Sequence, residues 1–87
     1  MEWIVQYDVV QMSSDPMYGN DRTLENGLDA DAMITHAKYL AMTRENICVI
    51  ERRFCGGENY KRGIEFDSQI IWADWLEPKD RRGKGLW

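Results

Sequence analysis

The chain has 87 residues, of which 44% are hydrophobic and 30% charged, and its formal net charge is −4. This length and composition predict one folded domain with a thin core and argue against global disorder. No apolar run approaches the roughly 18 residues that a membrane-spanning helix needs, and the first residues lack the basic region of a signal peptide. We therefore expect a cytoplasmic protein (host cytoplasm if viral) with no membrane partner.

Charge is divided unevenly along the chain. Residues 1–77 carry 7 Lys/Arg against 14 Asp/Glu, a net charge of −7, whereas residues 78–87 carry four basic residues against one acidic, a net of +3. We expect 1–77 to form a single α+β domain and 78–87 to be a flexible basic tail. The acidic body disfavours nucleic-acid binding over the whole surface and suits docking onto a basic protein surface.

The first half of the chain predicts a strand, a loop and a helix. Residues 2–12 alternate with Trp3, Val5, Tyr7 and Val9 on one face, as in a strand. Residues 13–28 are rich in Ser, Asp, Asn, Gly and Pro, which predicts a long loop with room for a short element at 23–25. Residues 30–43 place apolar side chains at helical spacing after Asp29, a natural N-cap.

The second half predicts a hairpin. Residues 46–54 read as a strand, 56–59 as a turn and 60–66 as a second strand, because apolar residues again alternate. Residues 68–77 fit either a strand or a short helix, and we favour the strand. The expected fold is therefore α+β: one helix packed on a small, mainly antiparallel sheet of three to four strands in the order β-α-β-β(-β). The long connection would let strands 2–12 and 46–54 lie parallel if adjacent.

The residue types that carry catalysis, metal binding or phosphate binding do not form a recognisable pattern. Cys48 lies within an expected strand and suits a core position, whereas Cys55 could be a reactive thiol beside Arg52 and Arg53 or a turn-edge thiol with no role. The only histidine is His36, the cysteines and histidine lack zinc-site spacing, and the Gly-Gly pair lacks a P-loop context. We expect no cofactor, no metal and no enzymatic activity.

Two basic pairs form the strongest candidate binding patch. Arg52 and Arg53 lie on one side of the expected turn, and Lys61 and Arg62 on the other, with Tyr60 among them. Each sheet face should receive about one Arg from each pair. Arginine with aromatic residues suits a protein interface or a surface that stacks on RNA bases. The alternative is a solvated hairpin whose cations pair with Glu51, Glu58 and Glu65.

An acidic stretch is a second candidate contact surface. Asp15, Asp21 and Glu25, followed by Asp29 and Asp31, could imitate phosphates toward a nucleic-acid-binding partner. Turn chemistry and helix capping explain most of these residues equally well.

The helix segment "AKYLAMTREN", the strand "ICVIERRF" and the sequence "WADW" resemble small phage-encoded inhibitors over about residues 30–75. The type I anti-CRISPR proteins and host-takeover proteins of lytic phages are of this kind. The resemblance implies a non-enzymatic blocker of a host macromolecular machine, such as a CRISPR or other nucleic-acid-handling complex.

Three functions remain open from the sequence. The first is a protein-binding inhibitor or adaptor whose partner is a host protein or ribonucleoprotein complex. The second is an RNA- or DNA-binding module that uses the basic hairpin and tail. The third is an enzyme subunit or small-molecule binder. Tryptophans near the C-terminus also make a homodimer an option.

Overall fold

The computed structural model describes residues 2–13, 15, 17 and 19–76, so the predicted basic tail lies outside the described residues. The elements are, in chain order, β1 (Trp3–Gln11), β2 (Arg22–Gly27), α1 (Ala30–Leu40), β3 (Ile47–Cys55), α2 (Gly57–Arg62), β4 (Asp67–Ala73) and a 3-10 helix (Asp74–Leu76). Within the described residues, no helix has the length and apolar character needed to cross a membrane.

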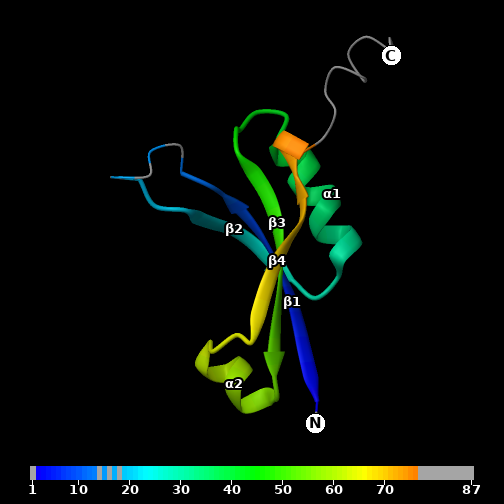
Figure 1. Ribbon diagram of the computed structural model, residues 1–87. Coiled ribbons are helices and arrows are strands. Elements are labelled where there is room, and N and C mark those ends of the chain that lie inside the picture. The colour runs from blue at the N-terminus through cyan, green and yellow to red at the C-terminus, as the bar shows by residue number, and fades with distance from the viewer. Residues whose placement is uncertain (1, 14, 16, 18, 77–87) are drawn as a thin grey trace.

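The four strands form one open sheet in the order β2-β1-β3-β4 (Figure 1). Every neighbouring pair is antiparallel, which confirms the predicted small α+β fold. The central strands β1 and β3 pair without interruption from Trp3 opposite Cys55 to Gln11 opposite Ile47. The expectation that these two strands would lie parallel is wrong, because β2 reverses the chain once more before α1.

β2 occupies the segment that the sequence predicts as a long loop with a short element. The strand spans Arg22–Gly27, five of its six residues pair with β1, and the connection before it shortens to 12–21. Most of the β2 side chains are exposed, with Leu24 half-buried. The strand therefore depends on its backbone pairing with β1 more than on an apolar face of its own.

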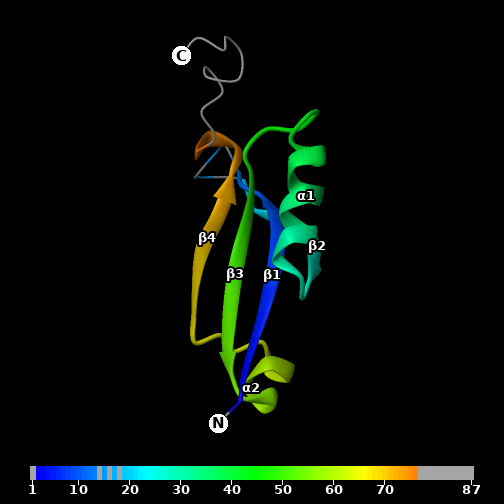
Figure 2. The same ribbon diagram turned by 90° about the vertical axis from the view of Figure 1, so that its right-hand side faces the viewer.

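α1 covers one face of the sheet beside the C-terminal half of β1 (Figure 2). The predicted cap is present: Asp29 Oδ1 accepts hydrogen bonds from the backbone N–H groups of Asp31 at 2.9 Å and Ala32 at 3.2 Å. Ala37 is completely buried, and its small side chain lets the helix lie close to Val9 and Val49. The predicted apolar face of the helix is thus the face that meets the core.

Both edge strands carry a β-bulge at the same row of the sheet. Val9 and Val49 face each other in the two central strands and are completely buried. Beside this row, β2 contains Leu24 as an extra residue and β4 contains Ile71 as an extra residue. Both side chains pack against the Val9–Val49 core, so each bulge adds one aliphatic group to it.

The predicted strand at 60–66 is wrong. Residues Gly57–Arg62 form the short helix α2, which is bracketed by Gly56 at φ 92° and Gly63 at φ 72°. Gly63 adopts the left-handed conformation that commonly ends a helix, since glycine has no Cβ to clash there. On the side of β3 away from β1, the antiparallel partner is β4. This strand confirms the preference for a strand in the segment 68–77, although it ends at Ala73.

Candidate functional site

Arg52 and Arg53 lie at the α2 end of β3 and point to opposite faces of the sheet. Side chains alternate along a strand, and the register places Arg53 beside Val5 and Arg52 beside Gln6. Arg53 therefore shares a face with α1, whereas Arg52 shares the other face with Asp8. The sequence correctly predicts this division, even though the turn and strand expected after it are absent.

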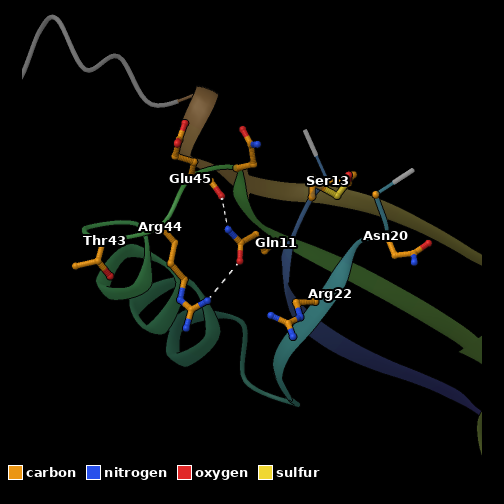
Figure 3. A pocket seen from close by; sticks show the side chains of 10 residues that line it. Gln11, Ser13, Asn20, Arg22, Thr43, Arg44 and Glu45 are labelled. Carbon is orange, nitrogen blue, oxygen red and sulfur yellow. Dashed lines mark hydrogen bonds between the residues drawn. The ribbon is translucent and has the colours of Figure 1, made fainter. Parts of the chain in front are cut away.

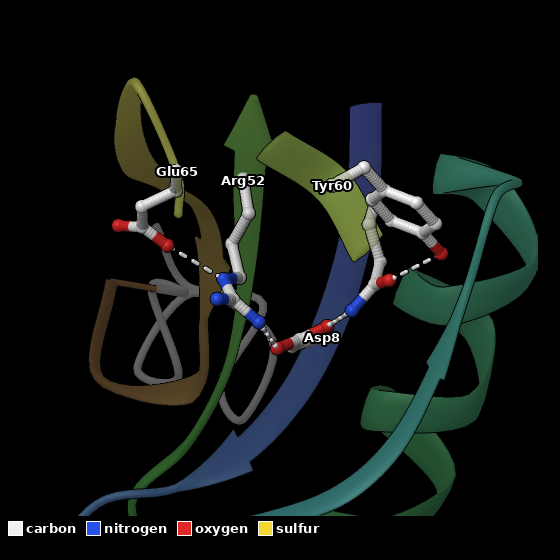
Figure 4. Close-up of polar contacts among 5 residues, drawn as sticks. Asp8, Arg52, Tyr60 and Glu65 are labelled. Atoms are coloured by element: carbon white, nitrogen blue, oxygen red, sulfur yellow. Dashed lines mark hydrogen bonds and ion pairs between the residues drawn. The ribbon is translucent and has the colours of Figure 1, made fainter. Parts of the chain in front are cut away.

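On the Arg52 face, five side chains form a continuous chain of polar contacts, which we call the Asp8–Arg52 network (Figure 4). Its members are Gln6, Asp8, Arg52, Tyr60 and Glu65. Arg52 donates from Nε to Glu65 Oε1 at 2.6 Å and from Nη1 to Asp8 Oδ2 at 3.1 Å. Gln6 Nε2 donates to the other oxygen of Asp8 at 2.7 Å, and Tyr60 Oη donates to Gln6 Oε1 at 2.9 Å.

Burial makes this network structurally important. Asp8 is only 5% exposed, so its carboxylate depends on Arg52 and Gln6 to replace the water it has lost. The hydrogen bond to Glu65, followed by that to Asp8, raises the pKa of Arg52 above its ordinary value. The Arg52 guanidinium also lies 5.2 Å from the centre of the Phe54 ring, which the Tyr60 ring meets edge-on at 5.1 Å. These contacts hold α2 and the following loop against the sheet.

On the other face, exposed aromatic rings surround Arg53. We call Trp3, Arg53, Phe66 and Asp67 the aromatic–arginine cluster. Trp3 and Phe66 meet edge-on with centroids 5.1 Å apart, although they are 46% and 63% exposed. The Arg53 guanidinium lies 5.4 Å from the centre of the Trp3 ring and 5.9 Å from that of Phe66.

A two-pronged ion pair fixes the orientation of Arg53. Its Nε and Nη2 donate to the two carboxylate oxygens of Asp67 at 2.7 and 2.5 Å. The hydrogen bond from Arg53 lowers the pKa of Asp67, and the same contact raises the pKa of Arg53. The bidentate pair therefore orients the planar guanidinium group beside the two rings.

The cluster continues into a polar hollow of about 260 Å³, whose lining includes Glu51, Ser68 and Gln69 together with Arg53 and Asp67. Gln69 Nε2 donates to Glu51 Oε1 at 3.0 Å. Burial raises the pKa of Tyr7, and the nearby Glu51 carboxylate raises it further. The open half of this face thus combines exposed aromatic rings with fixed polar groups.

The other predicted basic residues lie on α2. Lys61 and Arg62 are exposed in its last turn, where positive charge suits the negative end of the helix dipole. In the described part of the chain, neither forms an ion pair. Of the glutamates expected to neutralise the patch, only Glu65 pairs with an arginine, and Asp8 and Asp67 supply the remaining carboxylates.

The predicted acidic residues lie far along β1 from Arg52 and Arg53, toward the β1–β2 connection. Each accepts a local backbone hydrogen bond: Asp15 from Met17, Asp21 from Ser13 and Glu25 from Asn26. The Asp15 contact is a turn contact, the Asp21 contact joins the two ends of the β1–β2 connection, and the Glu25 contact lies within β2. The structure therefore does not bring the acidic and basic candidates into one site.

The two cysteines differ in their surroundings. Cys48 is completely buried, and burial raises the pKa of its thiol to about 11, so it remains protonated at neutral pH. Cys55 is half-buried at the end of β3, and its carbonyl oxygen accepts from Asn59 Nδ2 at 2.6 Å.

His36, the only histidine of the chain, lies on α1, which packs on the other half of the sheet from Cys55. Among the described residues, no three His, Cys, Asp or Glu side chains gather as a metal site would require.

Sequence reasoning missed Trp3 and Phe66 as site residues. It placed Trp3 on a buried strand face and Phe66 in a strand with Tyr60. A usable signal was the position of Trp3 at the very start of its strand, where covering side chains are scarce.

Comparison of the chain with protein-family models, curated proteins and solved structures finds no match.

Proposed function

We propose that this chain is a small non-enzymatic protein-binding module, an inhibitor or adaptor, that contacts its partner through the aromatic–arginine cluster. The observation that supports this most is the exposure of Trp3 and Phe66 around an arginine already fixed by Asp67. Trp and Arg are the residue types most enriched among interface hot spots. Fixing the arginine in advance reduces the entropy that binding would otherwise cost.

The charge pattern favours a protein partner over a nucleic acid. Arg52 and Arg53 are both neutralised by carboxylates within the chain, so they offer little charge to phosphates. Lys61 and Arg62 remain available on α2. The alternative, an RNA- or DNA-binding module, would have to depend on these two residues and on the basic tail.

The resemblance to phage inhibitors supports a more specific form of the proposal. In that form, the partner is a host protein or ribonucleoprotein complex that handles nucleic acid, and the module blocks it by occupying a contact surface. Inhibition by surface contact requires a stable fold and an exposed hot spot, and the cluster supplies the second.

The test compares capture by the wild-type chain with capture by Trp3→Ala and Arg53→Ala variants, using a nuclease-treated lysate of the native host. Captured proteins are identified, purified and titrated calorimetrically against each variant. Truncation of a hot-spot residue costs about 2 kcal/mol or more, so each variant should weaken binding by roughly 30-fold. The matched control is Met42→Ala, because Met42 is an exposed apolar residue beyond the C-terminal end of α1.

Three outcomes would overturn the proposal. Equal weakening by the Met42 control would show that the cluster has no special role. Loss of all capture after nuclease treatment would favour the nucleic-acid alternative. Unchanged affinity of both cluster variants would place the contact surface elsewhere on the chain.

A further inference from the structure

A second polar hollow, of about 490 Å³, lies at the opposite end of the sheet (Figure 3). The end of β1, the start of β2 and the loop between α1 and β3 form it. Its lining side chains include two arginines and several neutral donors: Gln11, Ser13, Asn20, Arg22, Thr43, Arg44 and Asn46. None of these residues belongs to the aromatic–arginine cluster or to the Asp8–Arg52 network.

The two arginines of this hollow come from different parts of the fold. Arg22 begins β2, and Arg44 follows α1, so different elements bring them to one opening. Figure 3 shows Gln11 between them, and Arg44 Nη1 donates to Gln11 Oε1 at 3.4 Å. Within the described residues, neither arginine forms an ion pair, although Arg52 and Arg53 both do. Five of the seven described Lys and Arg side chains form no ion pair within the described residues, and two of these five line this one hollow.

Hydrogen bonds between β1 and the α1–β3 loop hold the hollow in shape. Met12 N–H donates to the carbonyl oxygen of Asn46 at 2.9 Å, which ties β1 to the α1–β3 loop. Gln11 Nε2 donates to the carbonyl oxygen of Glu45 at 3.2 Å. Asn46 has a φ of 60°, a left-handed conformation that Asn tolerates better than most residues. The loop that carries Arg44 is therefore fixed at two points beside the hollow.

Two carboxylates lie near these cations. Glu45 lines the hollow, and Asp21 precedes Arg22. Asp21 Oδ1 accepts from the backbone N–H of Ser13 at 2.8 Å, so that carboxylate oxygen has a local partner. The lining itself contains two cations against one carboxylate, the reverse of the balance in the whole chain.

We propose that this hollow binds a phosphate-bearing anion, with Arg22 and Arg44 as the cationic ligands of the phosphate oxygens. The planar guanidinium group matches phosphate geometry and can donate two parallel hydrogen bonds. The Asn20 amide and the Thr43 hydroxyl line the same opening, whereas the Ser13 hydroxyl already donates to the carbonyl oxygen of Asp15 at 2.9 Å. The hollow is larger than one phosphate group, which leaves room for the organic part of a phosphate monoester.

Titration with inorganic phosphate, followed by amide and arginine side-chain NMR at constant ionic strength, tests the site. Saturable shifts should be confined to the lining residues. Arg22→Gln and Arg44→Gln should each weaken binding about tenfold, because each removes charge-assisted hydrogen bonds. Glu45→Gln should strengthen binding, because it removes the one carboxylate of the lining. Arg62→Gln on α2 is the matched control, since it removes the same charge at the far end and should change nothing.

Three further measurements complete the test. Ribose 5-phosphate should bind more tightly than inorganic phosphate if the natural ligand is a monoester, whereas equal affinities would assign the site to free phosphate. Acetate should bind more weakly than either. The proposal fails if Arg62→Gln weakens binding as much as Arg44→Gln, if Glu45→Gln weakens it, or if phosphate shifts do not saturate. Unchanged spectra of the unliganded variants establish that each one is folded.

Discussion

At the α2 end of the sheet, Arg52 bridges Glu65 and Asp8 on one face, whereas on the other face Arg53 lies beside two exposed aromatic rings. Both arginines pair with an aspartate. Burial separates the two pairs, since the side chain of Asp8 is 7% exposed and that of Asp67 is 47% exposed. The comparison teaches that one dibasic sequence can place one arginine in a pair with a buried carboxylate and the next in an exposed pair on the opposite face.

The largest expected effect comes from removing Arg52. In Arg52→Met, the side chain keeps most of its length but leaves the buried Asp8 carboxylate without its cation. Removing one partner of a buried pair is strongly destabilising, and we expect a loss of roughly 3 kcal/mol in the free energy of unfolding. Urea unfolding followed by tryptophan fluorescence measures it.

A double variant tests the physical reason for this loss. Adding Asp8→Asn to Arg52→Met removes the unpaired charge, so the double variant should be more stable than Arg52→Met alone. A loss below about 1 kcal/mol in the single variant would mean that Asp8 does not depend on Arg52.

A smaller effect is expected at Tyr60. Tyr60→Phe keeps the edge-on contact with Phe54 and removes only the hydroxyl that donates to Gln6. The loss of one half-buried hydrogen bond should cost about 1 kcal/mol. Hydrogen exchange of the α2 amides should accelerate more than that of the α1 amides. Equal acceleration in both helices would show that the network does not hold α2 specifically.

The smallest effect on stability is expected at Arg53. Arg53→Met should leave the urea midpoint unchanged within error, because exposed ion pairs contribute little to stability. The pKa of Asp67, which Arg53 lowers, should rise toward the ordinary aspartate value in the variant. Any stabilisation from this pair is present above the ordinary aspartate pKa and is lost as pH falls through the lowered one.

Carboxyl carbon NMR across an acid titration measures the pKa of Asp67 in both proteins, and Arg62→Met serves as the control. An unchanged pKa in Arg53→Met would contradict the observed two-pronged pair. A large drop in the urea midpoint would abolish the contrast between the two faces.

β1, α1 and β3 were predicted from patterns with one interpretation, whereas the β4 segment also fitted a short helix. β1 alternates from Val5 to Val9, and α1 combines a cap at Asp29 with apolar residues at helical spacing. β3 and β4 contain runs of Ile and Val or Ile and Trp that suit a half-buried strand. In each of these cases, local preference and tertiary packing favour the same structure.

The errors fall where local pattern and tertiary structure diverge. Tyr60, Ile64 and Phe66 alternate by coincidence, because Tyr60 belongs to α2 and Phe66 precedes β4. Lys61 and Arg62 followed by Gly63 were a usable helix-end signal that the alternation outweighed. β2 has too few apolar residues to be recognised alone, since its pairing with β1 determines it.

The candidate site was only partly predictable for a related reason. Alternation alone places Arg52 and Arg53 on opposite faces. Their partners depend on sheet register, since Asp8 lies 44 residues from Arg52 in the chain and meets it only because β1 pairs with β3. Without that register, the sequence could name the cations but not say which of them would be neutralised.

The bulges at Leu24 and Ile71 have a consequence for assembly. Both lie in edge strands, whose outer N–H and C=O groups are open to pairing with another chain. An extra residue breaks the regular spacing that an added strand must follow, so an incoming strand could match each edge over only part of its length. The bulges thereby shorten the stretch of each edge that could pair regularly with an added strand.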